Sequence, residues 1–151
     1  MLIYCITSVI QLLIHRFLEI DPALAAPIWR QIEDGMRRLV ASERLSSGSV
    51  VPSVRELARA LRVNPATVSK AYRRLTEAGL LTVRRGEGTF VGELSSEKLA
   101  EERHLLLTDG AAAYIRVATS VGANRDEAAR AVRERWESVR AEGGRGANDG
   151  A

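Results

Sequence analysis

The stretch SVRELARALRVNPATVSKAYRRLTEAG, residues 53–79, decides the fold because it holds two helix starts close together. Ser53 and Glu56 form a capping-box pattern, in which each side chain can accept a hydrogen bond from the other residue's amide. Asn64-Pro65 is a second start, since an N-cap residue precedes proline at the first helical position. Gly79 suits a left-handed cap that ends the second helix. Two helices joined this closely predict a helix-turn-helix.

Each predicted helix has one apolar side. On the first, helical spacing places Val54, Leu57, Ala58 and Leu61 on a common face, and on the second it does the same for Val68, Ala71, Tyr72 and Leu75. The opposite side of the second helix carries Ala66, Ser69, Lys70, Arg73 and Glu77. Small residues near its start and cations further along suit a helix whose N-terminal end enters a groove of nucleic acid.

The flanking segments complete a small domain. Upstream, apolar residues at spacings of three and four predict one amphipathic helix over Pro27–Leu45, and Val50-Val51-Pro52 is a short extended piece. Downstream, residues 80–84 and 89–91 alternate like strands around the tip Arg85-Gly86-Glu87-Gly88. Its glycines predict a tight hairpin that can approach another surface closely. This hairpin is the wing of a winged helix-turn-helix.

Two further helices are predicted after the wing. The first is capped by Ser95 or Ser96. Asp109-Gly110 can bend or interrupt this helix. Asn124 begins the second. The expected organisation is an apolar arm and leading segment (1–25), a winged helix-turn-helix (26–92), a helical dimerisation region (93–141) and a Gly-rich disordered tail (142–151). The fold class is mainly α with a small β wing.

Positive charge is concentrated in the middle of the chain. Residues 26–92 hold 12 Lys and Arg against 6 Asp and Glu, whereas the remainder holds 10 against 13. This asymmetry favours a polyanionic partner for the middle segment and a protein partner or solvent for the rest.

The N-terminal run Met1–Ile14 is apolar and uncharged, but it is too short to span a bilayer as a helix. It also lacks the preceding basic residues of a signal peptide. Two readings stay open: an arm that packs on the domain or its dimer mate, or a true translation start further downstream, at Leu18. With the single cysteine Cys5, no internal disulfide can form, and we expect a cytoplasmic protein.

Three segments together carry a family resemblance: VPSVRELA (51–58), LRVNPATVSKAY (61–72) and RGEGTFV (85–91). They resemble the DNA-binding domain of the GntR family of bacterial transcription regulators. The resemblance implies a homodimer on double-stranded operator DNA of two-fold symmetry, with the recognition helix in the major groove and the wing tip against the minor groove. On that basis the expected DNA-binding residues are Arg55, Asn64, Ala66, Thr67, Ser69, Lys70, Arg73, Arg84, Arg85, Gly86, Gly88 and Thr89.

Two residues depart from part of that family. Some branches carry arginines in the recognition helix where this chain has Pro65 and Ser69. We therefore expect base readout to shift to the other polar residues of that helix, with Lys70 and Arg73 favouring guanine.

Only 59 residues follow Gly92, too few for the large effector-sensing or aminotransferase-like domains of other GntR regulators. The short helical remainder resembles the YtrA subfamily, in which it serves dimerisation and in which members often repress ABC-transporter operons. The expected dimerisation residues are Leu99, Leu106, Ala113, Val117, Val121, Val132, Trp136 and Val139. A small-molecule effector that altered the packing of these helices would misalign the two DNA-binding domains.

The sequence gives no support to an enzyme. His15 and His104 stand far apart without a pattern of cysteine or carboxylate ligands, and neither a catalytic triad nor a phosphate-binding loop is present. We therefore expect no metal and no cofactor. Two alternatives remain: a winged-helix protein-interaction module, such as an antitoxin or adaptor, and a regulator tethered to the membrane by Met1–Ile14.

Overall fold

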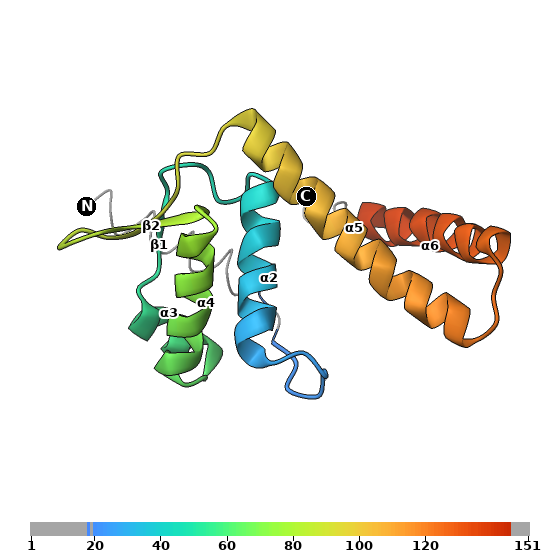
Figure 1. Cartoon of the computed structure of the whole chain (residues 1–151), viewed down its shortest axis with the longest axis horizontal. Helices are drawn as coiled ribbons and strands as arrows, with labels where there is room; N and C mark the ends of the chain where they lie inside the picture. The colour runs from blue at the N-terminus through green and yellow to red at the C-terminus, as the bar shows by residue number, and fades with distance from the viewer. Residues whose placement is uncertain (1–17, 19, 146–151) are drawn as a thin grey trace. The chain divides into compact units, whose positions relative to one another are not determined.

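The computed structural model describes Leu18 and residues 20–145 (Figure 1). In chain order the elements are α2 (Ile28–Ala41), β1 (Val50–Val51), α3 (Val54–Leu61), α4 (Pro65–Glu77), β2 (Leu81–Arg84), β3 (Gly88–Val91), α5 (Ser96–Ser120) and α6 (Arg125–Arg145). The expected class, mainly α with a small β wing followed by two helices, is confirmed. The predicted arm Met1–Ile14 lies outside the described residues. Within the described residues, no helix is both long enough and apolar enough to cross a membrane.

The core of the winged helix forms where α4 packs against α2 on one side and α3 on the other. The predicted apolar faces supply it, since helix packing removes such stripes from water. Its largest fully buried apolar side chains are Ile32, Met36, Leu39, Leu45, Leu57, Leu75, Leu80 and Leu81. Leu18, from the segment before α2, is buried with them and fills the space over Gly35.

The wing is part of a three-stranded antiparallel sheet of order β1-β3-β2. β2 pairs with β3 from Leu81↔Val91 to Arg84↔Gly88, which is the expected hairpin. β1, the short extended piece before α3, pairs with the other edge of β3 through Val50↔Phe90 and Val51↔Thr89. The wing is therefore attached to the helical core along both edges of β3.

The predicted helix caps are confirmed. The Ser53 hydroxyl accepts from the Glu56 amide at 3.3 Å, and the Glu56 carboxylate accepts from the Ser53 amide at 2.8 Å. These hydrogen bonds lower the pKa of Glu56. Asn64 caps α4, whose first residue is Pro65, and Gly79 has the left-handed φ of 75° that ends this helix. The helix-turn-helix is thus encoded by local chemistry.

The predicted helix Pro27–Leu45 is longer than the observed α2, which ends at Ala41. The Ser42 hydroxyl donates to the Arg38 carbonyl at 2.7 Å, and Glu43 adopts a left-handed φ of 57°. This turn brings Leu45 back into the core, where its amide donates to the Leu39 carbonyl. Burial of Leu45 favours the turn over continued helix.

The C-terminal region contains two long helices. α5 runs uninterrupted through Asp109-Gly110, because glycine weakens a helix without forbidding it. For the same reason α6 continues to Arg145, past the predicted start of the tail at Glu142. The chain divides into two compact units between Leu106 and Leu107, inside α5. The first turns of α5 belong to the winged-helix unit because Leu99 packs against its core.

Two glycine-to-alanine substitutions should change stability in opposite directions. A Cβ on Gly92 would lie 2.5 Å from the Gly79 carbonyl oxygen, so Gly92→Ala should lower the free energy of unfolding by about 1–3 kcal/mol. A Cβ on Gly110 meets open space within α5, so Gly110→Ala should raise it by about 0.5–1 kcal/mol. Thermal unfolding followed by circular dichroism compares the two variants. Equal shifts of the same sign would contradict this assignment.

Candidate nucleic-acid interface

The recognition helix α4 keeps its polar side free of the core. Val68, Ala71, Tyr72 and Leu75 are buried, whereas Asn64, Ala66, Ser69, Lys70 and Arg73 are exposed and Thr67 is half-buried. The side-chain oxygen Oδ1 of Asn64 accepts from the Ala66 amide at 2.8 Å, which leaves the side-chain NH₂ group available as a donor. The exposed side therefore presents small and hydrogen-bonding groups first and cations later.

Tyr72 ties this helix to the start of α3. Its hydroxyl donates to the Pro52 carbonyl at 2.8 Å, and burial raises the pKa of the phenol. The expectation that Tyr72 is a core aromatic is correct. Arg55, in the first turn of α3, is exposed. It lies on the helix that this hydrogen bond and the shared core hold against α4.

The wing tip presents two arginines on a glycine turn. Arg84 and Arg85 are exposed, and the Arg84 guanidinium lies over the Phe90 ring, with 4.5 Å between the guanidinium carbon and the ring centroid. Gly86 and Gly88 have φ values of 82° and 130°, which side-chain-bearing residues rarely adopt. Turn geometry thus requires both glycines, and Thr89 stands half-buried beside them on β3.

A buried polar network supports the recognition helix from behind. The Glu33 carboxylate on α2 accepts from Arg74 Nε on α4 at 2.6 Å and from Arg37 Nη2 at 3.2 Å. Arg37 Nη1 also donates to Glu102 on α5 at 2.6 Å. Burial opposes the charge of Arg37, but hydrogen bonds and attraction from Glu102 and Glu33 outweigh it and raise its pKa. Both carboxylates are buried, so these pairs fix α2, α4 and the start of α5 together.

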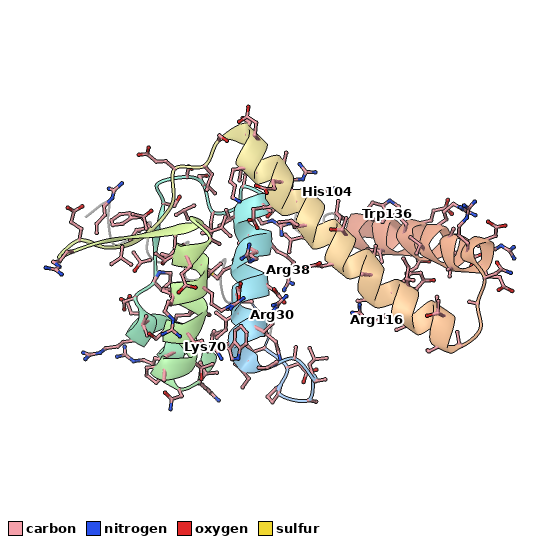
Figure 2. All side chains as sticks on the ribbon, in the orientation of Figure 1. Arg30, Arg38, Lys70, His104, Arg116 and Trp136 are labelled. Carbon is pink, nitrogen blue, oxygen red and sulfur yellow. The ribbon has the colours of Figure 1, made fainter. Side chains whose placement is uncertain are left out.

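The cations of this region fall into two groups. Arg37 and Arg74 are engaged by buried carboxylates, and Arg73 is only 4.0 Å from Glu77 with both side chains exposed. Among the described residues, Arg55, Lys70, Arg84 and Arg85 form no ion pair. Instead, the Lys70 ammonium lies 4.2 Å from the centroid of the Trp29 ring (Figure 2). These four side chains keep their positive charge at the surface.

The second set of predicted site residues lies on α5 and α6. Ala113, Val117, Val121, Val132, Trp136 and Val139 are exposed and Leu106 is half-buried. Leu99 is half-buried and packs against the winged-helix core of its own chain. Between the two helices lies an apolar cavity of about 500 Å³ lined in part by Tyr114, Ala118 and Ala128. The Tyr114 hydroxyl joins the two helices by donating to the Ala128 carbonyl at 3.0 Å.

Sequence reasoning missed Glu33 and the role of Trp29 as the neighbour of Lys70. The only sequence signal is a pair of spacings: Trp29 and Glu33 are four residues apart, as are Lys70 and Arg74. This spacing shows that each pair lies on one face of its own helix. It does not show that this face of α2 contacts this face of α4.

The comparisons agree with this geometry. The family model for bacterial regulatory proteins of the gntR family matches residues 29–91. The HTH-type transcriptional repressor YtrA of Bacillus subtilis is 37% identical over 92 residues, which is 61% of this chain and 71% of that protein. A GntR family transcriptional regulator from Listeria monocytogenes has a TM-score of 0.64 at 25% identity, over 73% of this chain and 96% of that one. YtrA from Sulfolobus acidocaldarius gives 0.50 at 33% identity, over 63% and 98%.

These relatives are transcription regulators rather than enzymes, and two of them carry the YtrA name. The match covers the helix-turn-helix and the wing. The chain therefore belongs to the gntR family of bacterial regulatory proteins, as a YtrA-like transcriptional regulator with a DNA-binding winged helix.

Proposed function

We propose that this protein is a sequence-specific repressor that binds an inverted-repeat operator as a homodimer. The observation that carries the proposal is the exposed polar side of α4, together with wing arginines that form no ion pair, on a fold whose relative in Bacillus subtilis is a transcriptional repressor. A helix of this kind enters the major groove, and phosphate contacts from neighbouring cations set its register.

The contacts divide by chemistry. Arg55 and the wing cations Arg84 and Arg85 bind phosphates, because they stand at the periphery of α4 and keep their charge. Base edges are read by Asn64, Ala66, Thr67, Ser69, Lys70 and Arg73, the side chains on or beside the exposed side of the recognition helix. Gly86, Gly88 and Thr89 allow the wing backbone to approach the minor groove.

The dimer forms through α5 and α6. Val121 is 75% exposed and Trp136 is 66% exposed, with Val117, Val132 and Val139 on the same two helices. Exposed apolar residues of this number are typical of a protein interface, and Val132 also lines the apolar cavity between the two helices. A second copy of the chain is the occupant that an operator of two-fold symmetry requires. We place this region, after the first turns of α5, as the dimerisation domain.

By resemblance to the YtrA subfamily, the regulated genes form an ABC-transporter operon. Such a regulator would act in the cytoplasm. An effector would act by changing the separation of the two recognition helices.

Operator binding should be strongly dependent on salt. The three cations per protomer that are assigned to phosphates, Arg55, Arg84 and Arg85, give about six contacts per dimer, so affinity should fall by roughly 10³–10⁵ between 50 and 200 mM salt. Selection of bound fragments from genomic DNA supplies the operator, and fluorescence anisotropy measures its dissociation constant at each salt concentration. A flat salt dependence, or failure to enrich any sequence, would argue against a DNA-binding repressor.

Arg55 and Lys70 should differ in the kind of loss they cause. Arg55→Ala removes a phosphate contact, so it should weaken binding to all sequences and reduce the salt slope by about 1 for each lost contact. Lys70→Ala should relax the preference at particular base pairs, at a cost of about 1–3 kcal/mol for a good base contact. Dissociation constants for single-base variants of the selected operator separate the two patterns. If both variants bind like the wild type, the residue assignment is incorrect.

Charge placed in the apolar surface of α6 should separate the protomers. Trp136→Asp should convert the dimer to a monomer in sedimentation experiments, because burying an unpaired carboxylate is costly. Ser138→Asp, two residues further on α6 and therefore on another side, is the matched control and should leave the dimer intact. Dissociation by both variants would mean that the interface is not confined to the side of α6 that carries Trp136.

A further inference from the structure

Lys70, on the exposed side of the recognition helix, is held by an aromatic ring of another helix. Its ammonium lies 4.2 Å from the centroid of the Trp29 ring, and Figure 2 shows Lys70 beside the N-terminal half of α2. The guanidinium carbon of Arg74, one turn further along α4, is 5.1 Å from the same centroid. Trp29 is half-buried, so part of its surface packs and part remains at the protein surface.

The place of the ring is fixed by the buried network. Trp29 and Glu33 lie one turn apart on α2, as Lys70 and Arg74 do on α4, so each pair shares one face of its helix. The 2.6 Å ion pair between Glu33 and Arg74 holds the two faces together. Trp29 therefore meets Lys70 at a defined position along the recognition helix.

An aromatic partner has a different effect on a cation from that of a carboxylate. The ring attracts the ammonium through its quadrupole but carries no net charge, so the field of Lys70 is retained. Glu33, in contrast, offsets the charge of Arg74. A free lysine side chain also loses considerable rotamer entropy when it is ordered. Contact with Trp29 reduces that loss on binding while the charge remains available to DNA.

We propose that Trp29 is a positioning residue for DNA recognition, which directs the Lys70 ammonium and thereby sets the base preference at the position that Lys70 meets. Trp29 acts through Lys70 and makes no base contact of its own. The inference rests on the proposed function, because it takes Lys70 as a DNA contact.

The test uses the full-length dimer and the operator selected by the wild-type protein. Dissociation constants are measured for that operator and its single-base variants with wild type, Trp29→Leu, Trp29→Phe, Lys70→Ala and the double variant Trp29→Leu/Lys70→Ala. Leucine keeps an apolar side chain but removes the ring face, and phenylalanine keeps a weaker ring. Thermal unfolding of each variant confirms that it is folded.

Trp29→Leu should weaken binding about two- to fivefold per protomer and relax preference at the same base positions as Lys70→Ala. Trp29→Phe should recover part of both effects. In the Lys70→Ala background, Trp29→Leu should have no further effect. A uniform loss across all base variants, or a loss that adds to that of Lys70→Ala, would overturn the proposal and assign Trp29 a packing or direct contact role. If the wild type selects no operator, it is the proposed function that fails.

Discussion

The buried carboxylate of Glu33 is the constraint on which the arrangement of the winged helix depends. A carboxylate in this position is tolerated only because Arg37 and Arg74 supply hydrogen bonds and compensating charge. Apolar packing brings α2 and α4 together, but it is non-directional and tolerates small rotations. The charged hydrogen bond from Arg74 on α4 to Glu33 on α2 is directional. It restricts the axial rotation of the recognition helix and therefore which of its side chains face outward.

The same constraint determines which cations are available to a ligand. The net positive charge of the domain suggests a broad basic surface, but Arg74 and Arg37 face inward to carboxylates. Among the exposed cations, Arg55 lies on α3, Lys70 on the outer side of α4, and Arg84 and Arg85 at the wing. The same residues, Glu33, Arg37 and Arg74, therefore affect both the orientation of α4 and the distribution of positive charge on its surface.

Sequence predicted what depends on neighbours in the chain and missed what depends on tertiary contact. The caps at Ser53 and Asn64 and the turns at Gly79 and Gly86 follow from residue chemistry over a few positions, and all were predicted correctly. The end of α2 at Ala41 was not, because Leu45 leaves the helix only to reach a core that the sequence does not display. The packing of Leu99 on the winged-helix core was missed for a similar reason, since an apolar residue on a helix does not reveal which surface covers it. The DNA-contact and dimer residues themselves remain predictions.

The separation of the two faces of α4 has a consequence for how such regulators diversify. Val68, Ala71, Tyr72 and Leu75 build the core, whereas Ala66, Ser69 and Arg73 contribute nothing to it. Substitutions at these three outward positions can accumulate without loss of folding, so a duplicated gene can acquire a new target site in single steps. Lys70 is less free to drift, because its neighbour on α2 would need to change with it. Specificity can therefore change one residue at a time at Ala66, Ser69 and Arg73. A change at Lys70 is expected to be accompanied by a change at Trp29.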